Sequence, residues 1–307
     1  MSIVTTIIPI FAIIILGLFS RRIGFIQPAF LEPANRLVYH LAIPAMIFRS
    51  ISHASLKTQF DITVLAITVL SVPAIFVVAW VVGSIARVKR KQIGTFIQSS
   101  FHGNLGYIGL AVAYYYLGDK GFVRASIIAG FIMILQNFLA VVVLQLYSTD
   151  IPAKKNILNL AWKILGNPII LSAMTGILFS FTETPIPLVI DRILDIISGL
   201  ALPMALLLIG ASLSFKLIRL QILLVLSSSI MKLILLPGLG FILYRLLDVA
   251  PQDFLPGLIL LASPTATISY VMAKELGGDT DFSVAAISIS TILSAITFSI
   301  WLNMMVF

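Results

Sequence analysis

Ten long apolar runs, separated by short polar breaks, make up almost the whole sequence. They cover residues 3–19, 34–50, 62–86, 94–117, 122–147, 160–180, 186–212, 220–246, 254–274 and 281–305. An α-helix needs roughly 20 apolar residues to cross the hydrocarbon core of a bilayer, and the runs are about that long. The pattern therefore predicts an all-α polytopic membrane protein with ten transmembrane helices.

The first run is expected to be a membrane span that stays in the protein. No Lys or Arg occurs within residues 1–13, and no small-residue cleavage site follows the run. A secretory signal peptide carries both features. We therefore predict a first transmembrane helix here rather than a signal peptide.

The composition indicates a surface that faces lipid. Hydrophobic residues make up 60% of the chain and charged residues 10%, with a mean hydropathy of +1.11. A soluble domain carries about 25% charged residues, so most of this surface cannot face water. The short loops leave no room for a separate soluble domain. The absence of cysteine excludes disulfides, thiolate metal sites and cysteine nucleophiles.

The net charge of +8 comes from short loops between apolar runs, which is typical of a topology signal rather than a nucleic-acid site. An outside N-terminus puts these basic residues at cytoplasmic ends: Arg21, Arg22, Arg36, Arg87, Lys89, Arg90, Lys91, Lys154, Lys155, Lys163, Lys216, Arg219 and Lys274. The opposite ends receive the smaller set of Arg49, Lys57, Lys120, Arg124, Arg192 and Arg245. We therefore predict both termini outside, a lipid bilayer as partner and no nucleic acid.

The two halves of the chain, residues 1–150 and 156–307, repeat one another at an offset of 159 to 160 residues. The matched features are Pro9 with Pro168, Gly17 with Gly176, Pro44 with Pro203, and Gly118-Asp119 with Gly278-Asp279. Apolar sequences resemble one another by chance, but so many turn and kink residues in register favour a true repeat. Five spans per half is an odd number, so the second half enters the membrane from the opposite side. Inverted repeats of this kind are typical of alternating-access transporters.

The fourth and ninth runs are each interrupted near the middle, at residues 102–106 and 262–267. Ser263 followed by Pro264 is typical of an N-cap and a first helical residue, and Asn104 is likewise a good N-cap. A half-helix that starts there would expose unpaired N–H groups and a positive dipole end at mid-membrane. Such groups are tolerated only inside protein or beside a water-filled cavity.

Two interpretations of the interruptions stay open. Either one alone is equally well explained as an ordinary kink whose backbone groups are satisfied by neighbours. Because both occupy equivalent places in the repeat, we expect them to cross near the membrane midplane. Their half-helix N-termini would then converge on one point, which suits an anion.

Lys232 lies near the centre of the eighth run. A centred Lys costs about 2.5 to 3.5 kcal/mol on insertion scales, so it needs a partner or a cavity. It acts either as the counter-charge of an anionic substrate or in a structural pair with Asp191 or Asp195. The structural pair is the default expectation, with snorkelling to one face as a further alternative.

Four other polar side chains interrupt apolar runs. Gln136 and Asn137 have interhelical hydrogen bonding as their default role and site lining as their second. An unperturbed imidazole titrates near neutral pH, so His40 and His102 are either packing residues or groups that couple transport to protons. The candidate substrate-binding residues are His102, Gly103, Asn104, Asn137, Lys232, Ser263, Pro264 and Thr265. No catalytic residue, cofactor or metal ligand is expected, and H⁺ or Na⁺ stays open as a coupling ion.

Four motifs stand out as a set. They are Leu-Ala-Ile-Pro44, Gly103-Asn104-Leu-Gly106-x-x-Gly109, Leu-Ala-Leu-Pro203…Leu-Ile-Gly210-Ala-Ser-Leu213, and Ser263-Pro264-x-Ala-x-x-x-Tyr270-Val-x-Ala273 running on to Gly278-Asp279. Together they resemble the auxin efflux carrier family, which holds plant auxin exporters and bacterial carriers of malonate and other small carboxylates. The similarity covers the whole chain. The long central loop of the plant exporters is replaced by a short segment, 147–157, which fits a compact bacterial carrier rather than an auxin exporter.

The resemblance implies a fold of two inverted five-helix repeats. Helices 1, 2, 6 and 7 would form a scaffold that is often dimeric. Helices 3–5 and 8–10 would form a transport domain whose crossover, marked by Asn104 and Pro264, holds the substrate. The resemblance also implies a homodimer in the bacterial inner (plasma) membrane. Such a protein would carry small organic anions, mono- or dicarboxylates, by elevator-type alternating access.

Two other functions stay open. The bile acid and sodium symporter group has a related architecture, so a sodium-coupled organic anion transporter is one alternative, although no acidic cluster lies at mid-membrane. A membrane sensor with a transporter fold is the other. An enzyme is not expected, because Gly-x-Ser-Gly, His-Glu-x-x-His and paired-aspartate signatures are missing from the runs.

Overall fold

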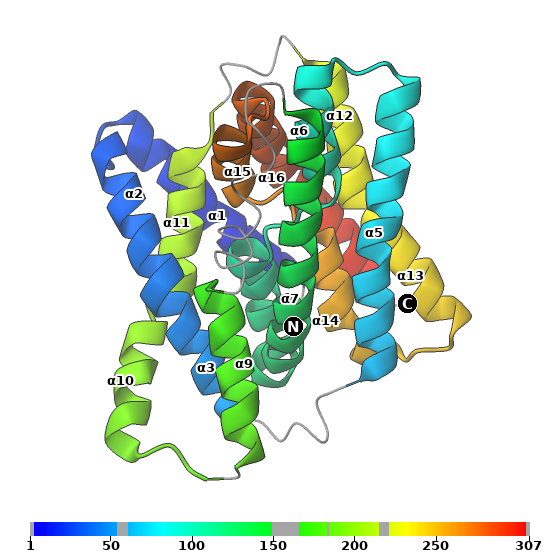
Figure 1. The fold of residues 1–307 in the computed structure, drawn as a ribbon. Helices are drawn as coiled ribbons and strands as arrows, with labels where there is room; N and C mark the ends of the chain where they lie inside the picture. The colour runs from blue at the N-terminus through cyan, green and yellow to red at the C-terminus, as the bar shows by residue number, and fades with distance from the viewer. Residues whose placement is uncertain (1–2, 54–60, 149–165, 183, 215–220, 305–307) are drawn as a thin grey trace.

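The computed structural model describes residues 3–53, 61–148, 166–182, 184–214 and 221–304, and all regular elements in these ranges are helices (Figure 1). With π-helical segments written η, they are α1 (Ile3–Arg22), α2 (Pro28–Leu37), η1 (Val38–Ala42), α3 (Ile43–Ser52), α5 (Ile62–Ile85), α6 (Arg90–Phe101), η2 (Leu105–Gly109), α7 (Leu110–Tyr147), α9 (Pro168–Phe181), α10 (Leu188–Ser198), α11 (Ala201–Ser212), α12 (Ile222–Ile230), η5 (Met231–Leu235), α13 (Leu236–Leu246), α14 (Pro251–Ala262), α15 (Ile268–Leu276) and α16 (Thr280–Asn303). The predicted all-helical class is confirmed.

Six helical stretches within the described residues are long and apolar enough to cross a membrane. They are Thr5–Arg22, Ile62–Ile85, Leu105–Tyr147, Leu188–Ser212, Ile222–Leu246 and Thr280–Asn303. Large apolar side chains on their outer faces, such as Leu223 and Ile196, are more than 75% exposed. Exposed apolar faces of this extent fit hydrocarbon rather than water, so the protein is a polytopic membrane protein.

The stretch Leu105–Tyr147 is too long for one crossing. At 1.5 Å per residue its 43 residues extend about 65 Å, roughly twice the thickness of a hydrocarbon core. Gly118 divides it, because its φ of 68° and ψ of −167° are not helical. The predicted runs 94–117 and 122–147 are therefore separated at this glycine, whose missing Cβ permits the positive φ.

Other boundaries differ from the sequence prediction by a few residues. The second helical path begins at Pro28 rather than at residue 34, because proline is well suited to the first helical position. The seventh run is divided at Gly199 into α10 and α11. The predicted topology residues Lys57, Lys154, Lys155, Lys163, Lys216 and Arg219 lie outside the described residues, and so do residues 149–157.

Two of the π-helical segments precede a proline. Pro44 follows η1 and Pro237 follows η5 at the start of the next α-helix. A proline in a helix lacks an N–H and presses on the carbonyl four residues earlier, which favours a locally wider turn. For Pro237 that carbonyl belongs to Leu233, and Trp301 on α16 donates its indole N–H to it at 2.9 Å. The freed backbone group is thus satisfied inside the protein, as a membrane interior requires.

The helices gather into two groups in Figure 1, with α2, α3, α9, α10 and α11 on one side and α5, α12 and α13 on the other. Within the first group α3 packs on α9, and α11 of the same group packs on α1. Glycine makes these approaches close: a Cβ on Gly17 would overlap the Leu207 carbonyl, and one on Gly210 would overlap the Ile14 carbonyl. Small residues at helix contacts are the usual means of packing helices in a membrane.

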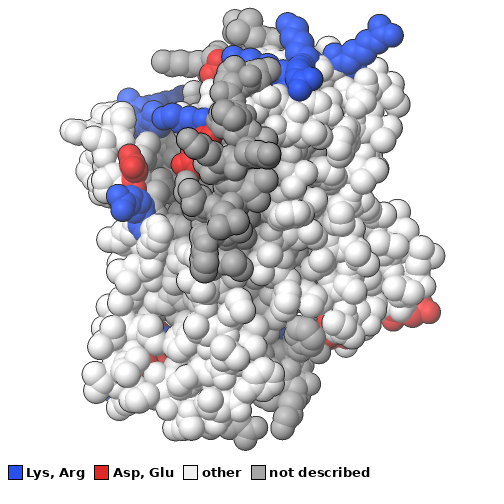
Figure 2. All heavy atoms as spheres, in the orientation of Figure 1, with Lys and Arg blue, Asp and Glu red and all other residues white. Residues whose placement is uncertain are grey.

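Charged side chains are concentrated at helix ends. Figure 2 shows that the Lys and Arg side chains visible on this face gather mainly at the end of the molecule where α5 ends and α6 begins. The broad middle of the same face carries almost no charge. This is the charge distribution of a protein whose middle zone lies in hydrocarbon.

Candidate substrate site where two broken helices meet

The interruptions in the fourth and ninth apolar runs lie side by side. Helix α6 ends at Phe101 and α14 ends at Ala262, and each is followed by non-helical residues before the chain becomes helical again. An antiparallel bridge joins Gly103 to Thr265. The Asn104 N–H donates to the Pro264 carbonyl at 2.7 Å, and the Ala266 N–H donates to the His102 carbonyl at 2.9 Å.

Local backbone chemistry explains why α14 stops where it does. Ser263 has φ −62° and ψ 143°, the extended conformation that the following Pro264 imposes on it. Pro264 also brings no N–H for a helical hydrogen bond. The Ser263 hydroxyl folds back and donates to the Leu260 carbonyl at 2.6 Å, which satisfies one of the last carbonyls of the helix.

This arrangement corrects the predicted cap at Ser263. We expected Ser263 and Pro264 to begin the next half-helix, whereas Ser263 closes the preceding one and α15 begins at Ile268 after an N-cap at Thr267. The reason is tertiary: the residues after Pro264 first pair with the chain at residues 102–104. Sequence alone gives the position of the break but not the length of the extended segment.

Asn104 does occupy the N-cap position of η2, as expected from the sequence, but its side chain makes no capping hydrogen bond. Its main-chain carbonyl instead accepts from the N–H groups of Ile108 at 3.2 Å and Gly109 at 3.0 Å. The side-chain amide of Asn104 is therefore available to hydrogen-bond another group.

Neighbouring helices hold the extended segments in place. On α7, Gln136 accepts from the Gly103 N–H at 3.1 Å and donates to the Gly103 carbonyl at 3.2 Å. On α16, the Ser290 hydroxyl accepts from the Thr265 N–H at 3.1 Å. The Thr265 hydroxyl donates to the Ser99 carbonyl at 3.0 Å. Each break is thus supported by a polar side chain from a different helix.

Several buried polar atoms around the breaks have no hydrogen-bond partner among the described residues. They are Asn104 Nδ2, His102 Nδ1, Ser99 Oγ and Ser269 Oγ. All four residues are at most 5% exposed. Leaving one such group unpaired in a protein interior costs about 1–3 kcal/mol. Their clustering beside the paired breaks provides hydrogen-bonding capacity for a small polar ligand.

Lys232 is fully buried behind the breaks. Its ammonium donates to the Leu261 carbonyl in the last turn of α14 at 2.7 Å. Its side chain passes close to Gly103: a Cβ at that glycine would lie 3.2 Å from Lys232 Cε and 2.8 Å from Ser263 Oγ. A side chain at this position would therefore force Ser263, and to a smaller extent Leu105 and Lys232, to move.

The predicted pair between Lys232 and Asp191 or Asp195 is wrong. Both aspartates bind Arg49 of α3, each at 2.7 Å, and His53 also contacts Asp191 at 2.8 Å. These carboxylates lie on α10, which packs on α3, whereas the Lys232 side chain reaches α14. Spacing along the sequence could not reveal which helices are neighbours.

The structure brings seven of the predicted site residues together at the breaks: His102, Gly103, Asn104, Lys232, Ser263, Pro264 and Thr265. Asn137 is the exception. Its neighbour Gln136 faces Gly103, and the helix rotates by about 100° per residue, so Asn137 is turned away and is only half-buried. His40 is also away from the breaks, exposed beside Tyr39 on η1.

Sequence reasoning missed Ser99 and Ser290 and gave Gln136 only a general role. The signal available for Ser290 was a set of hydroxyls on one apolar helix. On α16, Ser283, Ser290, Thr291 and Ser294 are all buried. Their spacing places part of this set on one face.

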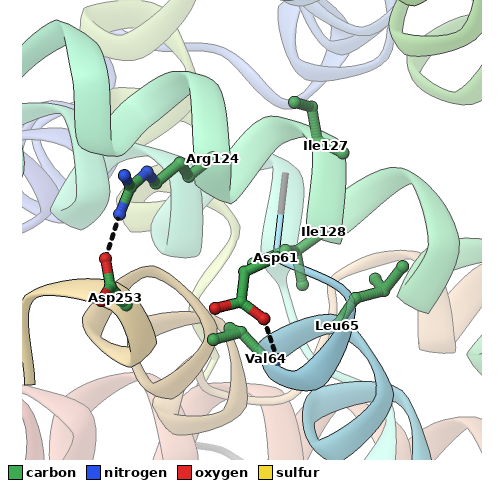
Figure 3. A pocket seen from close by; sticks show the side chains of 7 residues that line it. All are labelled: Asp61, Val64, Leu65, Arg124, Ile127, Ile128 and Asp253. Carbon is green, nitrogen blue, oxygen red and sulfur yellow. Dashed lines mark hydrogen bonds and ion pairs between the residues drawn. The ribbon is translucent and has the colours of Figure 1, made fainter. Parts of the chain in front are cut away.

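A pocket lies at the ends of helices, and its lining includes no residue of the breaks (Figure 3). Its lining residues are Asp61, Val64, Leu65, Arg124, Ile127, Ile128 and Asp253. Arg124 binds Asp253 at 2.8 Å, and the Asp61 carboxylate caps α5 through the Thr63 N–H at 2.8 Å. The charged groups here have structural partners, so the breaks are the better candidate for a substrate site.

Comparison with known proteins identifies the class of molecule. Residues 2–302 match the family model described as membrane transport protein, Mem_trans. The chain belongs to this family, the auxin efflux carrier family, and the predicted family resemblance is confirmed. It is therefore a membrane transporter and not an enzyme.

Similar proteins come from bacteria and archaea. The chain is 26% identical over 303 residues to a Rhizobium meliloti protein named "Putative malonate transporter", covering 95% of this chain and 92% of the relative. It is 25% identical to an uncharacterized transporter of Methanocaldococcus jannaschii, covering 94% of each chain. An uncharacterized transporter of Methanothermobacter thermautotrophicus is 22% identical, with 96% of each chain covered.

Proposed function

We propose that this protein is a secondary transporter of small organic anions of the mono- or dicarboxylate class, with malonate as the first substrate to test. The substrate would bind where the breaks after α6 and α14 meet. The observation that carries the proposal is a buried ammonium, Lys232, beside two hydrogen-bonded backbone segments. The neighbouring Asn104 amide and His102 imidazole each have an atom without a partner in the described part of the chain.

The chemistry of these groups suits a carboxylate. Asn104 Nδ2 is a donor that the protein does not use internally among the described residues, and Lys232 supplies positive charge. In a low-dielectric interior an anion is stable only where donors and a positive charge compensate for lost water. The name of the bacterial relative, which is similar over almost the whole chain, favours a malonate-like substrate.

We also propose that the fold is built from two inverted five-helix repeats, residues 1–150 and 156–307. Helices α6 and α14 support this because both contain 12 residues and both their starts and ends are 161 positions apart. Two pairs of positive-φ residues lie at nearly the same offset: Arg87 and Asp248 are 161 positions apart, and Gly118 and Gly277 are 159 apart.

An elevator-type mechanism follows from this division. The first, second, sixth and seventh of the ten predicted runs would form the scaffold. The third to fifth and the eighth to tenth runs would carry the substrate past it. Close packing of α1 on α11 and of α3 on α9 supports a rigid scaffold. The exposed apolar face of α10, which has no buried residue, offers area for a homodimer contact within the bilayer.

The proposed location is the bacterial inner membrane with both termini outside. The basic cluster between α5 and α6 supports this orientation, since short cytoplasmic loops are enriched in Lys and Arg. A sodium-coupled carrier is the second candidate because of the related symporter architecture, and a transporter-fold sensor is the third.

The test is counterflow in proteoliposomes. Vesicles loaded with unlabelled malonate should take up external radiolabelled malonate in a saturable way and faster than unloaded vesicles. Other mono- and dicarboxylates would be added as competitors to define the class. Folded protein that shows no saturable uptake of any of these anions would contradict the proposal, and ligand-induced stabilisation without counterflow would instead support the sensor.

A further inference from the structure

The turn that joins α5 to α6 carries a dense positive charge. Its four basic residues, which we call the basic turn, are Arg87, Lys89, Arg90 and Lys91, and all four are exposed. None of them belongs to an ion pair among the described residues. Figure 2 shows basic side chains at this end of the molecule that project beyond its body. The charge is therefore open to a partner outside the chain.

A carboxylate that contacts the first turn of α6 is already bound within the protein. Asp279 accepts from the Gln92 amide at 3.2 Å and from the Phe282 N–H at 2.9 Å, where it caps α16. No ion pair joins Asp279 to the basic turn in the described part of the chain. One carboxylate held in this way leaves most of the charge of the basic turn uncompensated.

The stability of α6 does not account for these charges. The helix begins at Arg90 with Lys89 as its N-cap, and its first turn contains no acidic residue. The N-terminal end of a helix is partially positive, so Asp and Glu stabilise it whereas Lys and Arg oppose it. Like charges this close together also repel one another. The basic turn therefore lowers the stability of the protein unless negative charge is supplied from outside.

The backbone at Arg87 does not require an arginine either. The Arg87 N–H donates to the Ser84 carbonyl at 3.1 Å, and the Val88 N–H donates to the Gly83 carbonyl at 3.0 Å. This pattern closes a helix C-terminus on a residue in the left-handed region, and Arg87 has a φ of 52°. Glycine adopts that conformation at the lowest cost. The side chain of Arg87 thus adds charge at a position where the local fold favours no side chain.

Neighbouring residues place the basic turn at the level of lipid headgroups. Ile85, two positions before Arg87, is 77% exposed, so this end of α5 faces the hydrocarbon. One turn or more earlier, Trp80 packs edge-on against Tyr147 with ring centroids 6.4 Å apart. Trp and Tyr are enriched at the interface between membrane and water. The seven positions from Trp80 to Arg87 extend about 10 Å along a helix, which carries the arginine to the depth of the phosphates.

We propose that the basic turn binds the phosphate groups of anionic phospholipids, with phosphatidylglycerol as the lipid to test. A lipid phosphate fits better than a soluble anion because the basic turn ends a lipid-facing helix and meets phosphates that the membrane holds at its own depth. A zwitterionic lipid balances its phosphate with its own ammonium and supplies less net charge. Binding removes the repulsion at the start of α6. The inference rests on the membrane class of the protein and not on its proposed substrate.

The first experiment compares the wild type in two kinds of nanodisc, one of phosphatidylcholine alone and one with about a third phosphatidylglycerol. Tryptophan fluorescence reports thermal unfolding at low salt. Phosphatidylglycerol should raise Tm by about 3 °C or more, because it neutralises the basic turn. About 0.5 M NaCl should remove most of this gain, since salt screens exposed charges.

A combined variant, Lys89→Gln with Arg90→Gln and Lys91→Gln, makes the test specific. In phosphatidylcholine it should be at least as stable as the wild type, because the repulsion is gone, and phosphatidylglycerol should raise its Tm by less than about 1 °C. The matched control removes three exposed basic residues dispersed over α7, α10 and α13: Lys120→Gln, Arg192→Gln and Arg245→Gln. The control has the same net charge as the variant and should keep the wild-type gain.

Native mass spectrometry of protein released from the mixed nanodiscs measures binding directly. The wild type should retain phosphatidylglycerol over phosphatidylcholine several-fold, and the basic-turn variant should lose that preference. A wild type without either the Tm gain or the lipid preference would overturn the proposal. So would a basic-turn variant that is less stable than the wild type in phosphatidylcholine or that keeps the full gain, or a control that loses it. An equal gain from inorganic phosphate added to phosphatidylcholine nanodiscs would show a soluble anion site instead and overturn the lipid assignment.

Discussion

Asn104 and Lys232 are both buried polar residues, but they differ in their hydrogen bonds within the protein. The Asn104 amide is buried and has no partner among the described residues, whereas the Lys232 ammonium is bound to the Leu261 carbonyl. An unpaired buried donor lowers stability, and it is retained only where another interaction compensates. Under the proposed function, this contrast separates a residue available to the substrate, Asn104, from one that also supports the fold, Lys232.

Replacement of Asn104 by Ala should reduce malonate counterflow at least tenfold without loss of folded protein. The reason is that the side chain makes no hydrogen bond to the described residues, so its removal should leave Tm close to that of the wild type. Counterflow rates and thermal unfolding of the purified variant check both parts. Asn303→Ala, at an exposed position near the end of α16, is the matched control and should behave as the wild type.

At the scale of elements, the two broken helices depend on helices that are not broken. Gln136 of α7 binds both backbone groups of Gly103, and Ser290 of α16 binds the Thr265 N–H. Backbone groups outside regular helices need such partners in a membrane protein, because lipid provides none. The shape of the site is therefore set by α7 and α16 as much as by the motifs themselves.

Replacement of Gln136 by Leu should lower the stability of the whole protein. It leaves the Gly103 N–H without its partner, at a cost of about 1–3 kcal/mol for the one buried group, whereas the Gly103 carbonyl still accepts from the Leu105 N–H. Chemical or thermal unfolding in detergent measures the loss. Gln145→Leu, at a half-buried position later on the same helix, should have a much smaller effect, and equal losses in the two variants would contradict the supporting role of Gln136.

At the scale of the whole molecule, the placement of charge and the order of the helices bear on the orientation of the protein in the membrane. The basic connection between α5 and α6 and the connection between α9 and α10 lie at opposite ends of the molecule in Figure 1. The proposed orientation places the first in the cytoplasm. The chain contains no cysteine, so each introduced cysteine is a unique label site.

Cysteine at Lys91 should react with a membrane-impermeant maleimide only from the cytoplasmic side, and cysteine at Thr184 only from the outside. Both positions are exposed in the structure, so access is decided by the membrane and not by burial. Labelling of intact cells and of inverted vesicles measures it. Labelling of both cysteines from the same side would contradict the proposed topology, and a reversed pattern would place the termini inside.

The amino-acid sequence by itself determined the membrane class, the family and the positions of the two interruptions. These features depend on local physics: apolar runs of a given length, a proline without an N–H and glycines that weaken a helical run. The steric need for Gly103 is visible only in the structure, but the motif that contains it is already distinctive in the chain.

Only the tertiary structure decided which distant groups meet. Lys232 binds the end of α14 instead of an aspartate, and Gln136 rather than Asn137 binds Gly103. Ser263 ends a helix instead of beginning one. In a ten-run apolar sequence many helix pairings satisfy the same hydrophobic pattern. The choice among them rests on close packing at glycines and on hydrogen bonds between residues far apart in the chain, which local pattern does not encode.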